Sequence, residues 1–229
     1  MLNEKVILIT GGSEGLGKAI AKQLAAANQV IICARDEERL KITAKEIGSD
    51  SYVCDVTQND QIENMVRNVL DKYQRIDILI NNAGIWVQGE LDTNKPDEIQ
   101  RLMEVNSLGT MFFSKAVIPI MKKQKSGSIV NIISQAGFYG KAERSVYQAS
   151  KWAINGFTKS LEMELSKYGI KVMGLYPGMM KTHIFENAGI QKDTTKGLEV
   201  EEVAKIVEFI LSFDSPLTFP EIGFKHMNQ

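Results

Sequence analysis

Short, uninterrupted apolar runs alternate along the chain with longer stretches in which apolar residues recur at helical spacing. Apolar runs without an alternating polar position are typical of strands that are buried on both faces of a sheet. They predict strands at Val6–Ile9, Val30–Cys33, Tyr52–Cys54, Ile78–Ile80, Ile129–Ile133, Val172–Leu175 and, more weakly, Thr218–Phe224. Helical patterns lie between these strands over Leu16–Ala27, Glu37–Ile47, Gln58–Tyr73, Pro96–Lys123, Ser145–Lys167 and Val200–Leu211.

This repeated strand–helix order predicts an α/β fold with a doubly wound parallel sheet and helices on both of its faces. Parallel neighbours need crossover connections, and those connections are nearly always right-handed. No linker and no shift in composition divides the 229 residues. We therefore expect a single domain over residues 1–229.

Composition and charge narrow the function classes. The 27 Lys and Arg residues are balanced by 28 Asp and Glu residues, so no basic excess favours nucleic acid. No apolar stretch approaches a signal-peptide core or the ~20 residues that span a bilayer, and we expect a cytoplasmic protein without membrane contact. Cys33 and Cys54 lie within apolar runs and are interpreted as reduced core thiols. His183 and His226 lack the spacing of metal ligands, so no metal is expected.

A glycine-rich turn follows the first predicted strand directly, over Thr10–Gly17. Glycines at such a turn let a phosphate approach backbone N–H groups at the start of the next helix. Gly12–Lys18 has the spacing of a Walker A loop, but Ala19 replaces the hydroxyl residue that binds Mg²⁺. The dinucleotide pattern Gly-x-Gly-x-x-Gly is also incomplete, because Ile20 replaces its third glycine. The pattern that fits is Thr-Gly-x-x-x-Gly-x-Gly.

Tyr147 and Lys151 are four residues apart at the start of a helical pattern, which places both on one helix face. A free tyrosine titrates near pH 10, and a nearby ammonium group favours the phenolate. The pair is therefore a candidate acid/base unit, with a surface lysine beside a half-buried tyrosine as the alternative interpretation.

Further polar motifs follow the predicted strands. Ser134 follows the fifth strand, Asn81–Gly84 ends the fourth, and Pro177-Gly178 ends the sixth, while Asn106 lies in the long helical segment. In open α/β sheets, ligands bind outside the carboxyl ends of the strands, where these motifs meet. We therefore expect them to form one site.

Together these motifs closely resemble the short-chain dehydrogenase/reductase family in its short, single-domain form, over roughly residues 5–182. The resemblance implies a Rossmann-like fold with strand order 3-2-1-4-5-6-7. It also implies an NAD(P)(H)-dependent oxidoreductase of the EC 1.1.1 type that acts on a small carbonyl compound or secondary alcohol, as carbonyl and 3-oxoacyl reductases do. In this comparison Tyr147 is the general acid/base, and Lys151 lowers its pKa and binds the nicotinamide ribose. Ser134 hydrogen-bonds the substrate oxygen, and Asn106 holds a water in the proton relay.

The resemblance also implies a path for the cofactor. The pyrophosphate and the adenosine side are expected at Gly11, Ser13, Gly15, Leu16 and Gly17. The nicotinamide side is expected at Asn82, Ala83, Gly84, Pro177, Gly178 and Thr182. Asp55 is expected to meet the adenine amino group, with Val56 beside the ring. The alternative for Asp55 is an N-cap of the next helix, a role for which Thr57 competes.

The end of the second strand bears on cofactor choice. NAD-preferring folds carry an acidic residue there, whereas this chain has Ala34 followed by Arg35. A guanidinium group suits the 2′-phosphate of NADP, so we expect NADP(H), with NAD(H) as the alternative. Asp36 is expected to cap the next helix.

Substrate recognition is expected in a lid over roughly residues 179–198. Met179 and Met180 are interpreted either as substrate contacts or as core residues. The lid has no arginine cluster that indicates a strongly anionic substrate, and the C-terminus lacks the Asp-Gly-Gly ending of many reductases of carrier-linked ketones.

Two further hypotheses concern assembly and activity. Ala149, Ala153, Gly156 and Ser160 form a small-residue stripe at helical spacing, which either packs on the protein's own sheet or supports a homotetramer or dimer. The alternative to an enzyme is a catalytically silent protein that senses dinucleotides. The retained Asn106, Ser134, Tyr147 and Lys151 argue against it.

Overall fold

The structure, a computed structural model, describes residues 2–214 and 216–228. Its centre is a seven-stranded sheet with the order β3-β2-β1-β4-β5-β6-β7, in which every neighbouring pair is parallel. The strands are β1 (Val6–Thr10), β2 (Gln29–Ala34), β3 (Asp50–Val53), β4 (Ile78–Asn81), β5 (Gly127–Ile132), β6 (Ile170–Pro177) and β7 (Glu221–Phe224). This order and the parallel arrangement confirm the predicted doubly wound fold.

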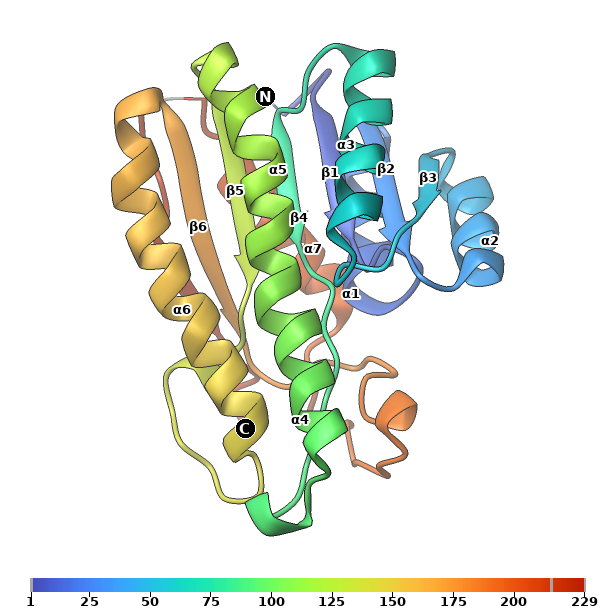
Figure 1. Cartoon of the computed structure of the whole chain (residues 1–229), viewed down its shortest axis with the longest axis vertical. Coiled ribbons are helices and arrows are strands. Elements are labelled where there is room, and N and C mark those ends of the chain that lie inside the picture. Colours follow the sequence, from blue (N-terminus) through green and yellow to red (C-terminus); the bar gives the residue numbers. More distant parts are fainter. Residues whose placement is uncertain (1, 215, 229) are drawn as a thin grey trace.

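Helices cover both faces of the sheet (Figure 1). The main helices are α1 (Gly15–Ala25), α2 (Glu37–Ile47), α3 (Asn59–Tyr73), α4 (Pro96–Met103), α5 (Gly109–Gln124), α6 (Ser145–Leu165) and α7 (Val200–Leu211). One core cluster joins the sheet to α1, α2 and α7, and a second joins it to α3, α5 and α6. None of the helices in the described ranges has the length and apolar character to cross a membrane.

The two clusters explain why the strands appear in the sequence as unbroken apolar runs. Along β1, Ile7 and Ile9 belong to one cluster, whereas Val6 and Leu8 belong to the other. Successive side chains of a strand point to opposite faces, and here both faces are covered by helices. All five residues of β1 are consequently buried.

The long helical pattern over Pro96–Lys123 is the main difference from the prediction. The structure divides it into α4, a π-helical turn over Glu104–Leu108, and α5. A π-helical turn adds a residue to the helix without changing the apolar pattern on either side, so periodicity alone does not reveal it. Such turns occur frequently at functional sites, and this one contains Asn106.

Candidate active site

A cavity of about 1200 Å³ opens at the carboxyl ends of the strands. It is larger than the ~300–1000 Å³ of most small-molecule pockets. Its wall combines the glycine-rich turn, the ends of β2, β4, β5 and β6, the start of α6 and the segment after β6. This is the edge at which the sequence predicts the site.

The glycine-rich turn is held in place by the end of β4. The Thr10 hydroxyl accepts hydrogen bonds from the backbone N–H groups of Asn82 and Ala83, both at 3.0 Å. The Asn82 side-chain amide donates to the carbonyl oxygens of Thr10 and Gly11, at 3.0 and 3.1 Å. A Cβ atom at Gly17 would lie 2.2 Å from the Gly11 carbonyl oxygen, so only glycine fits there. Gly17 thus shapes the turn by packing and does not line the cavity.

Ser134 follows β5 in an unusual backbone conformation, with φ 123° and ψ 155°. Side chains other than glycine rarely adopt this conformation, and strained residues of this kind cluster at active sites. The Ser134 hydroxyl accepts a hydrogen bond from the Ala136 N–H at 3.2 Å and acts to lower the pKa of Tyr147. The strained backbone therefore delivers the hydroxyl to the tyrosine.

Tyr147 and Lys151 lie one turn apart in the first half of α6, and each is only 6% exposed. The Lys151 ammonium donates a hydrogen bond to the Ile132 carbonyl oxygen at 3.1 Å, and its Nζ lies 5.8 Å from the centroid of the Tyr147 ring. Burial disfavours its charged form and lowers the pKa of Lys151 to about 8. The Lys151 side chain is therefore held by a hydrogen bond to β5 and lies near the Tyr147 ring on the cavity wall.

The pKa of Tyr147 departs from its ordinary value in the direction opposite to the sequence prediction. Burial raises the pKa of Tyr147 to about 12, although the Ser134 hydrogen bond and the Arg144 charge act to lower it. Desolvation wins because the Lys151 ammonium bonds a backbone carbonyl and not the phenol. The phenol is consequently protonated at neutral pH, which is the form that donates a proton.

Asn106 has no surface on the cavity and is fully buried in the π-helical turn. Its carbonyl oxygen accepts from the Ile85 N–H at 2.8 Å, and its amide donates to the Ile85 carbonyl and the Ser150 hydroxyl, both at 3.1 Å. Ser150 in turn donates to the Tyr147 carbonyl oxygen at 2.7 Å. These contacts tie the segment after β4 to α6, the helix that carries Tyr147 and Lys151. The predicted water relay stays a prediction.

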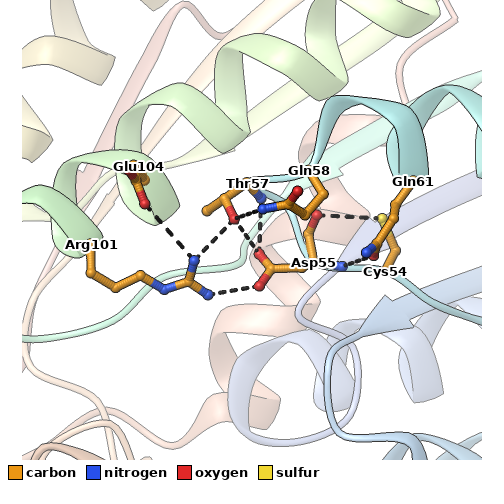
Figure 2. A network of polar contacts seen from close by, with 7 residues as sticks. All are labelled: Cys54, Asp55, Thr57, Gln58, Gln61, Arg101 and Glu104. Carbon is orange, nitrogen blue, oxygen red and sulfur yellow. Dashed lines mark hydrogen bonds and ion pairs between the residues drawn. The ribbon is translucent and has the colours of Figure 1, made fainter.

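Asp55 belongs to a polar network beside the cavity (Figure 2). Its carboxylate accepts from Arg101 at 2.8 Å and from the Thr57 N–H and hydroxyl at 2.9 and 2.8 Å. Burial acts to raise the pKa of Asp55, but these hydrogen bonds outweigh it and leave that pKa lowered. Cys54 and Val56 line the cavity, whereas Asp55 does not. Helix α3 has Gln58 before its first residue and no side-chain cap, so neither Asp55 nor Thr57 is the N-cap.

The residues after β2 separate into one capping group and one unpaired cation. Asp36 caps α2 by accepting from the Arg39 N–H at 3.0 Å, as predicted. Arg39 also forms ion pairs with Asp36 and Glu14, at 3.2 and 3.1 Å. Arg35 lines the cavity, and within the described ranges it has no ion pair.

Most predicted site residues meet around this cavity. Those on its wall are Gly11, Ser13, Gly15, Leu16, Arg35, Val56, Asn82, Ala83, Gly84, Ser134, Tyr147, Lys151, Pro177, Gly178 and Thr182. Gly17, Asp55 and Asn106 lie behind the wall.

The sequence analysis missed several cavity residues, and two of them, Trp86 and Arg144, lie beside Tyr147. Trp86 lies two residues after Gly84, and its ring centroid is 4.2 Å from that of Tyr147. Arg144 lies one helical turn before Tyr147, and its guanidinium carbon is 5.1 Å from the centroid of the Trp86 ring. Their nearness in sequence to Gly84 and Tyr147 is the signal that points to them.

The segment over residues 179–198 forms one wall of the cavity. It is closed at its base, where Met180 bridges Leu198 and the Leu198 N–H donates to the Met179 carbonyl oxygen at 2.9 Å. Met179 and Met180 line the cavity and also pack against core clusters. Their contact with the substrate stays a prediction.

Known proteins resemble this chain over nearly its whole length. The family model for short chain dehydrogenase matches residues 5–194. An uncharacterized oxidoreductase of Staphylococcus epidermidis is 34% identical over 227 residues, which cover 98% of each chain. A metagenomic short-chain oxidoreductase solved with NADP is 31% identical, with a TM-score of 0.84 and 96% of each chain covered. The 3-ketoacyl-(acyl-carrier-protein) reductase of Brucella melitensis, solved with NADH, is 25% identical, with a TM-score of 0.93 and 99% of each chain covered. The chain therefore belongs to the short-chain dehydrogenase family of oxidoreductases.

Proposed function

We propose that this protein is an NADP(H)-dependent reductase that transfers a hydride between the nicotinamide and a carbonyl compound or its secondary alcohol. The observation that carries the proposal is the convergence of Ser134, Tyr147 and Lys151 on the wall of one cavity. Related proteins with solved structures hold NADP or NADH, and one of them is a ketoreductase.

The cavity suits a dinucleotide. Its glycine-rich turn leads into α1, whose first turn has no acidic residue and whose N-terminus has no side-chain cap. Free N–H groups at a helix N-terminus favour a pyrophosphate. Gly11, Ser13, Gly15 and Leu16 would hold the pyrophosphate side, and Lys151 would bind the nicotinamide ribose. When bound, the cofactor supplies the hydride.

The chain's own residues supply the proton and the orientation. The Tyr147 phenol, protonated at neutral pH, donates its proton to the substrate oxygen as negative charge develops there. The Ser134 hydroxyl donates a hydrogen bond to the same oxygen and stabilises that charge. Burial raises the pKa of Tyr147 to about 12, so the phenol carries at pH 7 the proton that carbonyl reduction requires.

Activity is tested by incubating the protein with NADPH and a panel of ketones, aldehydes and 3-oxoacyl thioesters, and following the absorbance of the reduced nicotinamide. Turnover of at least one carbonyl class is expected. Tight NADPH binding without turnover across the panel would instead favour the silent dinucleotide sensor.

Cofactor preference is tested at Arg35, which lines the cavity next to the end of β2. Charge-assisted hydrogen bonds of ~1.5–3 kcal/mol correspond to a preference of roughly 10- to 150-fold for NADPH over NADH. Dissociation constants for both cofactors are measured on the wild type and on Arg35→Ala. Tighter NADH binding by the wild type, or unchanged NADPH affinity in the variant, contradicts the assignment.

We also propose that the protein forms a homotetramer or dimer through α6. Ala149, Gly156 and Ser160 are exposed on this helix, beside Trp152 at 52% and Met163 at 77% exposure. The alternative in which the small-residue stripe packs on the chain's own sheet does not agree with this exposure. Light scattering should give a particle of twofold or fourfold the chain mass, and a particle of 25.5 kDa at micromolar concentration would contradict the proposal.

A further inference from the structure

The charges around the cavity are unequal. Acidic side chains on the wall are confined, within residues 2–214 and 216–228, to Glu14 and Asp36, and both form ion pairs with Arg39 on the side of the glycine-rich turn. The wall on the tyrosine side carries Lys141 and Arg144 before α6, and Lys192 on the segment after β6. This side therefore has positive charge that no carboxylate on the wall offsets.

Arg144 is the cation nearest to the catalytic tyrosine in sequence, and its charge reaches the phenol. Its side chain is half-buried, it acts to lower the pKa of Tyr147, and its guanidinium carbon lies 5.1 Å from the centroid of the Trp86 ring. Across the described part of the chain, Arg144 has no carboxylate within ion-pair distance. A partly desolvated arginine on a ligand cavity costs free energy unless an anion pairs with it.

An apolar patch separates this guanidinium from the tyrosine. The Trp86 ring packs against Tyr147 at 4.2 Å between centroids and against Phe185 at 4.9 Å. Met179 and Ile184 belong to the same cluster and line the cavity. A ligand that spans from Tyr147 to Arg144 thus crosses an aromatic surface before it meets the positive charge.

We propose that the substrate is an oxo acid, a ketone or aldehyde whose carboxylate binds Arg144 while its carbonyl oxygen meets Tyr147. This inference rests on the proposed reductase activity and adds the substrate class. The carboxylate and the carbonyl are separated by a short apolar or aromatic spacer that lies on Trp86. Arginine favours carboxylates because its planar fork donates two parallel hydrogen bonds.

The substitution that tests the proposal leaves the helix start intact. Arg144 initiates α6 through its backbone, because its carbonyl oxygen accepts from the Gln148 N–H at 2.8 Å and its side chain makes no capping hydrogen bond. Arg144→Gln therefore removes the charge and keeps the cap. Arg67→Gln is the matched control, because Arg67 is exposed on α3 and lies outside the cavity wall.

The first experiment compares oxo acids with their neutral methyl esters, for example 4-acetylbenzoate and methyl 4-acetylbenzoate, together with aliphatic pairs of varied spacer length. Wild type and Arg67→Gln are expected to prefer an acid over its ester by at least tenfold in kcat/KM, mainly through KM. Arg144→Gln should lose that preference, so that the kcat/KM values for an acid and its ester come within about threefold of each other. An electrostatic effect of Arg144 on Tyr147 alone would change acid and ester equally.

The outcomes separate this inference from the proposed function. If neutral ketones are reduced and no acid is preferred over its ester, the oxo-acid assignment is wrong and the reductase stands. If the whole panel gives no turnover, both are wrong.

A second experiment does not depend on turnover. Binding of benzoate, which lacks a reducible carbonyl, is followed through tryptophan fluorescence, since Trp86 lies beside Arg144. Benzoate should quench the tryptophan fluorescence of the wild type. It should bind at least tenfold more weakly to Arg144→Gln. Equal binding to both proteins, or equal competition by inorganic phosphate at the same concentration, would overturn the carboxylate site.

Discussion

The two halves of the cavity are built by different means. In the half that we propose for the dinucleotide, the Thr10 hydroxyl, the Asn82 amide and backbone groups join the glycine-rich turn to the end of β4. Glycine stands where the chain approaches itself. In the substrate half, side chains from separate loops meet: Trp86 after β4, Arg144 before α6 and Phe185 after β6. In the first half, few other residues could take the place of those present. In the second half, different side chains could form the wall.

This difference indicates which half of the cavity tolerates a change of side chain. A phosphate-binding turn requires a fixed backbone path, and that path constrains Gly11 and Gly17. A loop-built wall requires only that apolar side chains pack, as Trp86, Tyr147 and Phe185 do here.

Tyr147→Phe changes the substrate half of the cavity alone and is expected to give the largest loss of activity. The variant loses only the ionisable hydroxyl, so kcat should fall by roughly 10³- to 10⁴-fold, in the range of general acid catalysis. The aromatic contact with Trp86 is retained, and the NADPH dissociation constant should change less than about threefold. Single-turnover kinetics and cofactor titration measure the two quantities. Retention of more than a few per cent of the wild-type rate would contradict the acid/base assignment.

Gly17→Ala breaks the dinucleotide half. The added Cβ atom would lie 2.2 Å from the Gly11 carbonyl oxygen and 2.5 Å from the Asn82 amide nitrogen, so the turn must move. Overpacking of this kind costs about 1–3 kcal/mol of unfolding free energy, and the displaced turn should weaken NADPH binding at least tenfold. Urea unfolding and calorimetric titration check both effects.

Gly48→Ala is the control for that variant. Gly48 has φ 69°, but a Cβ atom there meets nothing within 4 Å. It should cost about 1 kcal/mol of stability through the backbone alone, with cofactor affinity unchanged. Equal cofactor affinity in both variants would show that the packing at Gly17 has no part in the phosphate site.

The contrast between local and distant contacts also separates the features that the sequence predicts from those that it does not. The sheet order and the glycine-rich turn depend on local patterns, such as the apolar runs of β1 and the Thr10–Gly17 motif, and these predictions agree with the structure. The prediction that Tyr147 and Lys151 share one helix face also agrees with the structure, because the spacing of four residues determines that relation.

Features that depend on distant partners were missed. The π-helical turn is stabilised by Asn106 contacts with Ile85 and Ser150, which lie 21 and 44 residues away. The direction of the Tyr147 pKa follows from its burial, which no motif encodes. Arg101 lies 46 residues from Asp55 in the sequence, and the hydrogen bond between them cannot be read from a local motif. The sequence analysis therefore placed Asp55 beside the adenine and did not identify Arg101 as its partner.

Lys151→Met tests a residue that we propose to contact the cofactor and that also lies near Tyr147 in the substrate half of the cavity. Burial lowers the pKa of Lys151 from 10.5 to about 8, so the charged form is costly in the folded protein. Methionine avoids that cost but loses the hydrogen bond to Ile132, worth about 1 kcal/mol. We expect the variant to be about 1–2 kcal/mol more stable than the wild type at pH 7, with turnover abolished and cofactor affinity reduced.

The pH dependence supplies the control for Lys151. Between pH 8 and 10.5 the unfolded wild type binds more protons than the folded protein, so its stability rises with pH in this window. The methionine variant lacks that gain, and its advantage in melting temperature should shrink as the pH rises from 8 to about 10. A constant difference from pH 7 to 10 would show that the burial of the charge is not its cause.

Arg101→Gln gives the smallest effect and tests to which half the Asp55 network belongs. The guanidinium donates to Asp55 at 2.8 Å and to the Thr57 hydroxyl at 3.0 Å, which orients the chain on both sides of Val56 (Figure 2). Both charged side chains are partly exposed, so the loss in stability should stay below about 1 kcal/mol. If this network supports the adenine wall, the NADPH dissociation constant should rise about three- to tenfold while kcat stays unchanged.

The matched control for Arg101→Gln is Lys72→Gln, which breaks the ion pair between Lys72 and Asp50 outside the cavity wall. Lys72→Gln removes one positive charge, as Arg101→Gln does, and one partly exposed ion pair, whereas Arg101→Gln removes the ion pairs with Asp55 and Glu104. It should leave the NADPH dissociation constant unchanged. Arg101→Lys keeps the charge but cannot reach both oxygens with a planar fork, so it should give an intermediate affinity. A dissociation constant equal to that of the wild type in both Arg101 variants would separate Asp55 from the cofactor and leave its network as a support for the start of α3.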